Sequence, residues 1–202
     1  ALAAAKEGIF AAEIAPGSVD GRAVAADEGP RECTAADLSR LRAAFGEGGT
    51  ATAGNSSQLS DGAAAALVCT RAYAQKHGLP VLGCLRSFAV CGVDPAVMGV
   101  GPAAAIPLAL AQAGVAATDV SVFEINEAFS NVTMANTQLL GLDPAKVNVY
   151  GGAVSLGHPV GASGARIICT LLSVLKNNNA KLGSAGICNG GGGASAVVIE
   201  RV

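Results

Sequence analysis

From residue 120 onward the chain alternates short apolar runs with polar, glycine-containing segments, and this alternation constrains the fold more than any other feature. Apolar runs typical of buried strands cover residues 120–125, 147–150 and 183–187. The first run is followed by residues 126–129, which open a helical pattern that ends near Leu140. The second is followed by glycine-containing segments and a helical pattern that ends near Lys176. Strands that alternate with helices are typical of layered α/β folds. We therefore expect helices to cover a sheet in this region.

The rest of the chain predicts further elements. They are a helix over 35–45, a helix over 63–76 capped by Ser60 or Asp61, a strand over 81–91, a loop and buried helix within 95–118, and a last strand over 194–200. Pro159 is expected in the first turn of the helix that ends near Lys176, where a missing N–H costs nothing.

Composition excludes several classes of protein. The net charge is -2 and charged residues make up 14% of the chain, without the basic stripe that nucleic-acid binding requires. Hydrophobic residues make up 51%, which argues against a disordered chain. The uncharged run between Asp94 and Asp119 contains three prolines and mostly alanine among its apolar residues. A bilayer span needs about 20 strongly apolar residues, so this run predicts no membrane helix.

Three side chains able to do chemistry follow expected strands: Asn126, His158 and Cys188. Ligands of open α/β sheets bind beyond the carboxyl ends of the strands, so these residues are expected to meet at one sheet edge. Each also has a simpler interpretation: Asn126 as a helix N-cap, His158 as a capping or core imidazole, and Cys188 as a buried core thiol.

The surroundings of two of these residues favour a reactive site. Cys188 precedes a run of glycines, so neighbouring side chains do not crowd its thiol, and the Gly190 N–H is placed to stabilise an oxyanion. Gly157 and Pro159 flank His158 at an expected helix start, where the positive helix end favours the neutral imidazole. A neutral imidazole can take a proton from a thiol.

Three motifs resemble, in their order and spacing, those of the thiolase family. They are N-E-A-F at 126–129, G-G-A at 151–153 with G-H-P at 157–159, and C-x-G-G-G at 188–192. The flanking segments 52–68 and 92–102 extend the resemblance over nearly the whole chain. The amino-acid sequences of residues 147–167 and 187–196 are most similar to those of the acetyl-CoA acetyltransferases of the family.

The resemblance implies a layered α/β thiolase-like fold. Its C-terminal core domain would hold a mixed five-stranded sheet covered by helices. Residues 1–59 would end the substrate-binding loop domain, 60–80 would be the last elements of the N-terminal core, and 81–202 would form the C-terminal domain. The chain would thus be the C-terminal half of a thiolase. The nucleophilic cysteine would lie outside it, because Cys91 matches a non-catalytic position.

The resemblance also implies an activity. A thiolase completed by its N-terminal half would condense two acetyl-CoA molecules to acetoacetyl-CoA and catalyse the reverse thiolysis. Two alternatives remain open, namely a degradative 3-ketoacyl-CoA thiolase of fatty-acid β-oxidation and a non-catalytic structural or interaction fragment. The interpretation as a nucleotide-dependent oxidoreductase would depend only on Gly99 and Gly101. Pro102 lies inside that glycine pattern, which makes the match weak.

The resemblance assigns roles residue by residue. Cys188 would remove the α-proton of acetyl-CoA, and His158 would activate the nucleophile and help to hold a thioester oxygen. Asn126 would position an oxyanion-hole water, and Gly190 would donate its N–H to a second oxyanion hole. Residues expected to contact the pantetheine arm or wall the pocket are Ser57, Phe45, Ala53, Leu59, Ala128 and Phe129.

Expected partners follow from the same resemblance. They are acetyl-CoA and acetoacetyl-CoA, the missing N-terminal half, and further copies in a homodimer or homotetramer, with neither nucleic acid nor membrane. No metal or cofactor is expected, because coenzyme A thioesters are substrates that acidify their own α-carbon. The predicted compartment is the cytoplasm, with mitochondria or peroxisomes as alternatives.

Overall fold

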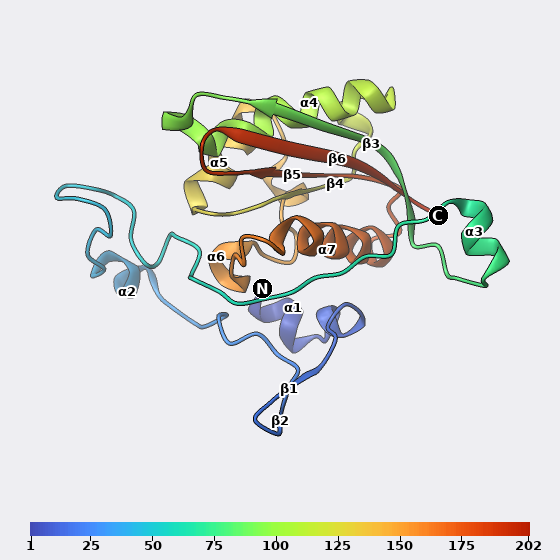
Figure 1. The fold of residues 1–202 in the computed structure, drawn as a ribbon. Coiled ribbons are helices and arrows are strands. Elements are labelled where there is room, and N and C mark those ends of the chain that lie inside the picture. The colour runs from blue at the N-terminus through green and yellow to red at the C-terminus, as the bar shows by residue number, and fades with distance from the viewer.

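A four-stranded sheet in the order β3-β6-β5-β4 forms the centre of the computed structural model, which describes residues 1–202 (Figure 1). Its strands are β3 (Gly83–Gly92), β4 (Val122–Ile125), β5 (Leu182–Cys188) and β6 (Gly193–Arg201). β4 and β5 are parallel, whereas β6 runs antiparallel to both β3 and β5. The α/β class and the mixed sheet are confirmed, and the four strands lie where the sequence predicts them.

The fifth expected strand, over 147–150, is not formed. Val147 makes only an isolated parallel bridge to Phe123 of β4. The next residue, Asn148, has a left-handed φ of 48°, and its side chain takes over the pairing. Asn148 Oδ1 accepts from the Ile125 N–H at 2.8 Å, and Asn148 Nδ2 donates to the Ile125 carbonyl at 2.9 Å. A side-chain amide therefore replaces a strand at the edge of β4.

Helices cover both faces of the sheet (Figure 1). The helices are α1 (Leu2–Lys6), α2 (Ala35–Ser39), α3 (Arg71–Lys76), α4 (Gly101–Ala113), α5 (Ser130–Leu139), α6 (Ala153–Leu156) and α7 (Ser163–Asn177). On one face, Ile106 and Ala109 of α4 pack with Ala196 of β6 in an apolar cluster. On the other face, Leu171 and Leu175 of α7 pack against β4 and β5. These two layers hold the carboxyl ends of β4 and β5 in place.

The segment Pro95–Ala113 is long and apolar enough to cross a membrane by length and composition. It consists of a 3₁₀ helix, Pro95–Val100, followed by α4. Ala105, Ile106 and Leu110 of α4 are buried in the core between this helix and the sheet. This placement is that of the core helix expected from the sequence.

The N-terminal segment lies on the outer side of α7 (Figure 1). It contains α1 and a two-stranded hairpin of β1 (Gly17–Val19) and β2 (Arg22–Val24). The ring of Phe10 packs edge-on against Tyr150 with centroids 6.2 Å apart. Thr170 of α7 donates a hydrogen bond to Glu13 at 3.1 Å. The segment is therefore joined to the helix that follows His158.

The helix expected over 35–45 is shorter than predicted. α2 begins as the sequence indicates, because the Thr34 hydroxyl accepts from the Asp37 N–H and the Asp37 carboxylate accepts from the Thr34 N–H. It ends at Ser39, and Ala43 then bridges Thr52 in an antiparallel pair. The later residues of the expected helix thus form part of a small loop.

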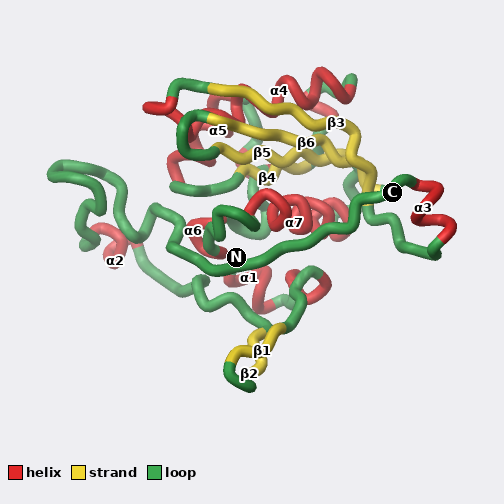
Figure 2. Tube along the Cα trace, in the orientation of Figure 1, coloured by secondary structure: helices red, strands yellow, loops and turns green.

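The helix expected over 63–76 is also wrong in its first half. Residues 58–70 have no regular structure, and this long loop leads from the region of α2 to α3 (Figure 2). Leu67 and Val68 are 74% and 81% exposed, so no apolar surface packs against this stretch. Short helices are marginal without such packing. Only 71–76 is helical, and the Thr70 hydroxyl caps it by accepting from the Tyr73 N–H at 3.2 Å.

Candidate active site

Asn126 and His158 meet beyond the carboxyl ends of β4 and β5. The Asn126 N–H donates to the carbonyl of Gly186 on β5 at 2.9 Å, which seats Asn126 at the sheet edge. Asn126 Nδ2 lies 3.3 Å from His158 Nε2. Cys188 ends β5 two residues beyond Gly186. The loops of Asn126 and His158 and the end of β5 thus lie at the sheet edge that the sequence predicts.

The loop of His158 is shaped by its neighbours. Gly157 has a φ of 92°, a conformation that side-chain-bearing residues rarely adopt. A Cβ at this position would also collide with Ser60 of the long loop. Pro159 was expected to open the helix, but α7 begins only at Ser163. A single turn precedes it, in which the Ser163 N–H donates to the Pro159 carbonyl at 2.9 Å.

Hydrogen bonds define the tautomer of His158. Ser163 Oγ donates to the Pro159 carbonyl at 3.0 Å, and this uses its only proton. With that proton given to the carbonyl, we assign Ser163 Oγ, 2.6 Å from His158 Nδ1, as the acceptor of the Nδ1 proton. His158 Nε2 then carries the lone pair and accepts from Asn126 Nδ2. The imidazole presents a basic nitrogen toward the sheet edge.

The surroundings also keep His158 uncharged. Desolvation by burial lowers the pKa of His158, and the positive charge of Arg166 lowers this pKa further. A neutral imidazole with a free lone pair is suited to accept a proton from a thiol. With the proton on Nε2, the same nitrogen becomes a donor to an oxygen.

Asn126 is fully buried, with 0% of its surface exposed. It was expected to open a helix, but α5 begins at Ser130 and residues 126–129 form a loop. Asn126 Oδ1 is buried and has no partner in the protein. A buried acceptor of this kind costs free energy unless it is paired. Its position beside His158 suits a hydrogen bond from a water or a ligand.

Cys188 is 3% exposed at the end of β5. Desolvation by burial raises the pKa of its thiol, so the protonated form is favoured at rest. Once deprotonated, a thiolate of raised pKa is a stronger base than an ordinary one. Its thiol makes no hydrogen bond to His158 or Asn126 in this structure. It is therefore a candidate for transferring a proton to and from carbon.

Gly190 lies in the exposed turn that joins β5 to β6. In this turn the Asn189 N–H donates to the Gly193 carbonyl at 2.9 Å, and the Gly192 N–H donates to the Asn189 carbonyl at 3.3 Å. The Gly190 N–H makes no backbone hydrogen bond. It is therefore free to donate to an oxyanion near Cys188.

Most of the predicted pocket residues meet the N-E-A-F loop. The Ser57 N–H donates to the Ala128 carbonyl at 2.9 Å, and Ser56 forms an antiparallel bridge with Phe129. The rings of Phe45 and Phe129 pack at 75° with centroids 6.2 Å apart.

Two predicted pocket residues lie apart from this contact. Ala53 lines a shallow depression with residues 41–44. The side chain of Leu59 is fully exposed.

Several residues that support the site were not identified from the sequence. Glu127 Oε2 accepts from the Val154 N–H at 3.2 Å and so joins the N-E-A-F loop to α6. Glu124, Glu127 and Glu13 all interact electrostatically with Arg166 of α7. These side chains come from segments far apart in the chain, so no local pattern indicates them. Ser163 is the exception, since a serine five residues after His158 at a helix start is visible in the sequence.

No group of three or more His, Cys, Asp or Glu side chains is arranged to hold a metal ion. The groups that gather at the sheet edge are an imidazole, a thiol, an amide and a backbone N–H. This set suits proton transfer and oxyanion binding.

The chain matches two family models. One, described as thiolase, C-terminal domain, covers residues 79–201, and the other, described as thiolase, N-terminal domain, covers residues 1–72. The chain is 50% identical over 206 residues to acetyl-CoA acetyltransferase 2 of Arabidopsis thaliana, a match covering 98% of this chain and 51% of that protein. It is 46% identical over 211 residues to peroxisomal 3-ketoacyl-CoA thiolase B of Rattus norvegicus, covering 99% of this chain and 50% of that protein.

Solved structures agree with these relatives. The crystal structure of the Bacillus anthracis acetyl-CoA acetyltransferase matches with a TM-score of 0.92 and 39% identity, covering 100% of this chain and 52% of that one. The human mitochondrial 3-ketoacyl-CoA thiolase in complex with CoA matches with a TM-score of 0.93 and 36% identity, covering 100% and 51%. The chain thus spans about half the length of the relatives it matches.

Proposed function

Because this chain belongs to the thiolase family, we propose that it supplies the acid/base half of an acetyl-CoA acetyltransferase. The whole enzyme would condense two acetyl-CoA molecules to acetoacetyl-CoA and catalyse the reverse thiolysis. The observation that carries the proposal is the His158–Asn126 contact at 3.3 Å, at the sheet edge where β5 ends in Cys188. The nucleophilic cysteine of the reaction would come from a segment outside these residues.

His158 acts first in this mechanism. Its Nε2 lone pair takes the proton of the nucleophilic thiol, and the thiolate attacks the acyl-CoA thioester. The Nε2–H formed in this way then donates to a thioester oxygen. Ser163 holds Nδ1 throughout, so the ring need not turn between the two roles.

Cys188 acts after His158. Its thiol first gives its proton to the CoA thiolate that leaves when the nucleophile is acylated. The Cys188 thiolate formed in this way removes a proton from the α-carbon of a second acetyl-CoA. The resulting enolate attacks the acyl group held by the nucleophile, whose sulfur leaves and takes back its proton from His158 Nε2. The N–H of Gly190 and a water held by Asn126 stabilise the oxyanions that develop. No metal or cofactor is needed, because the thioester acidifies the α-carbon and the thiol is the leaving group.

The substrate arm would lie along the N-E-A-F loop. Ser57, the Phe45–Phe129 pair and Ala128 gather there, and we assign this side to the pantetheine arm, with Ala53 and Leu59 as further predicted walls. The complex of a structural relative with CoA supports CoA thioesters as the substrates. A homodimer or homotetramer remains the predicted assembly.

A second candidate is a degradative 3-ketoacyl-CoA thiolase. It is supported by relatives with that name, which are about as similar to the chain as the acetyltransferases. Some of these relatives are peroxisomal, so peroxisomes are the supported alternative to the predicted cytoplasm. Thiolysis rates of acetoacetyl-CoA and of a longer 3-ketoacyl-CoA by the full-length protein separate the two candidates. A strong preference for the longer chain overturns the acetyltransferase assignment.

The role of Cys188 is tested by Cys188→Ser in the full-length enzyme. Solvent deuterium exchange into acetyl-CoA and condensation should fall by at least about a hundredfold, since general acid–base groups contribute roughly that much. The affinity for CoA, measured by calorimetry, should change by less than about threefold, because the thiol serves the transition state rather than binding.

The matched control is Cys169→Ser, which alters a half-buried thiol on α7 outside the site. Parallel losses of binding and exchange in the Cys188 variant would contradict the acid/base role. An inactive wild-type full-length protein would instead support the non-catalytic alternative.

A further inference from the structure

Asn136 joins α5 to the start of α4 through two hydrogen bonds and makes a third within α5. Its Oδ1 accepts from the Ala103 N–H at 2.6 Å, and its Nδ2 donates to the carbonyls of Gly99 and Val132, each at 2.7 Å. The side chain is fully buried, with 0% exposed. The bonds to Gly99 and Ala103 hold both sides of the junction between the 3₁₀ helix and α4.

This junction needs an external partner. The first N–H groups of a helix have no acceptor within it, and Ala103 lies in the first turn of α4. The preceding 3₁₀ helix is kinked at Val97, whose φ and ψ are not helical. A side-chain amide carries both a donor and an acceptor. Asn136 can therefore satisfy a carbonyl before the junction and an N–H after it with one group.

The same junction lies against Cys188. A Cβ on Gly101, the first residue of α4, would lie 2.6 Å from Ala194 Cβ and 3.6 Å from Cys188 Cβ. The Gly101 backbone therefore packs directly on the strand ends, with no room for a side chain. Cys188 pairs with Ala194 across β5 and β6. The start of α4 is thus part of the wall that keeps Cys188 buried, with 3% of the residue exposed.

We propose that Asn136 is a positioning residue for Cys188. Its amide holds the start of α4 against the end of β5. Because Gly101 at this helix start packs beside Cys188, the position of α4 also fixes the position of the Cys188 thiol. The claim that Asn136 affects catalysis rests on the acid/base role proposed for Cys188. The claim that Asn136 keeps Cys188 packed does not depend on that role. Asn136 touches no reacting atom and acts only through the junction.

The test replaces Asn136 by leucine in the full-length protein. Native protein is treated with iodoacetamide, and the labelling of each cysteine is followed by peptide mass spectrometry. Leucine has similar volume but no polar atoms, so the junction opens locally. Cys188 labelling should rise about tenfold or more, as expected for a local opening, while Cys169 labelling on α7 stays within twofold of wild type.

Two further variants make the result specific. Asn131→Ala changes an exposed asparagine on the same helix and should leave labelling unchanged. Gly99→Ala places a Cβ 2.8 Å from Val132 Cγ2, which pushes the same junction from α5 without removing a hydrogen bond. It should also raise Cys188 labelling selectively, and it decides the matter if the leucine variant does not fold. Unchanged Cys188 labelling, or an equal rise at Cys169, overturns the positioning role.

Deuterium exchange into acetyl-CoA supplies the catalytic readout. A misplaced base should slow exchange by about ten- to a hundredfold with little change in KM. Selective labelling together with unchanged exchange would overturn the acid/base role of Cys188, and with it the catalytic part of this inference. The failure of the positioning role and the failure of the proposed function are therefore distinguishable.

Discussion

Ser163 determines what His158 can do, although it lies outside the three short motifs at 126–129, 151–159 and 188–192. Its hydroxyl accepts the Nδ1 proton at 2.6 Å because its own proton is committed to the Pro159 carbonyl. The basic nitrogen of the imidazole is therefore Nε2, which faces Asn126. One hydroxyl thus selects the tautomer that the proposed mechanism needs.

Ser163→Ala should disturb this selection in the full-length enzyme. Without the acceptor, the proton is no longer held on Nδ1, and part of the population carries it on Nε2. We expect kcat to fall by roughly ten- to a hundredfold, with KM little changed. Nitrogen-15 NMR of the labelled imidazole should show the mixed tautomers directly.

Ser163→Thr is the matched control, because threonine keeps the hydroxyl at the start of α7. It should retain most of the wild-type kcat and the single tautomer. A single unchanged tautomer in the alanine variant would contradict the assignment to Ser163.

At the scale of elements, β4, α7 and the N-terminal segment bring buried carboxyl groups close to Arg166. Glu124 of β4 is 1% exposed, and burial raises the pKa of its carboxyl to about 8. Arg166 of α7 opposes this rise in the pKa, while Glu13 and Glu127 add to it. Burial likewise raises the pKa of Glu13 and the pKa of Glu127. Glu124 is therefore largely protonated near neutral pH.

This raised pKa predicts how stability depends on pH. In the unfolded chain the carboxyl ionises near its ordinary value of 4.5, whereas the folded protein keeps the proton up to about pH 8. The contribution of Glu124 to stability is thus complete below pH 4.5 and is lost as the pH rises to 8. The Glu124→Gln variant cannot ionise at this position. Its free energy of unfolding, relative to that of wild type, should therefore increase between pH 4.5 and pH 8, by on the order of a few kcal/mol.

Urea unfolding of the full-length protein between pH 5 and pH 8 measures this difference. Glu47→Gln, which alters an exposed carboxylate in the loop after α2, is the matched control and should follow wild type at every pH. The prediction is contradicted if the free energies of unfolding of the Glu124 variant and wild type differ by the same amount at every pH. The Glu124 carboxyl would then ionise in the folded protein as it does in the unfolded chain.

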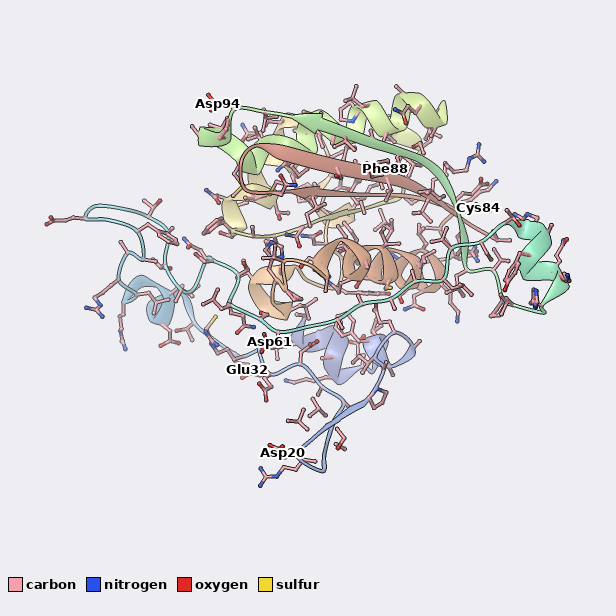
Figure 3. The ribbon with its side chains drawn as sticks, in the orientation of Figure 1. Asp20, Glu32, Asp61, Cys84, Phe88 and Asp94 are labelled. Atoms are coloured by element: carbon pink, nitrogen blue, oxygen red, sulfur yellow. The ribbon has the colours of Figure 1, made fainter.

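At the scale of the whole molecule, residues 1–202 leave much apolar surface uncovered. Phe88 lies on β3 (Figure 3) and is 53% exposed, and Leu85 and Val90 on the same strand are 56% and 61% exposed. Leu67 and Val68 of the long loop add to this surface. Exposed apolar area of this kind marks an interaction surface or leads to aggregation.

We therefore expect residues 1–202, expressed alone, to be insoluble or molten. Light scattering after size exclusion should show aggregates, and thermal unfolding should lack a cooperative transition. The full-length protein, measured in the same buffer, should be monodisperse and melt cooperatively. A monodisperse monomer of residues 1–202 that melts cooperatively would contradict this expectation.

Local pattern was sufficient for the strands and for the place where the site residues gather. The runs at 81–91, 120–125, 183–187 and 194–200 all contribute strands, as short apolar runs bounded by turn residues indicate, whereas the run at 147–150 does not. Asn126 and Cys188 follow strand ends, so their approach to one sheet edge could be inferred before the fold was known. The N-E-A-F, G-H-P and glycine motifs then indicated the family, which the family models confirm.

Tertiary structure decided the rest, because the deciding contacts join residues far apart in the chain. Asn148 replaced an expected strand by bonding to β4, and the helix expected over 63–70 did not form for want of a packing partner. Asn136 bound the start of α4 beside Cys188. Sequence periodicity reports which residues can be buried, whereas a buried hydrogen bond depends on which segment arrives opposite, and only the folded chain determines that.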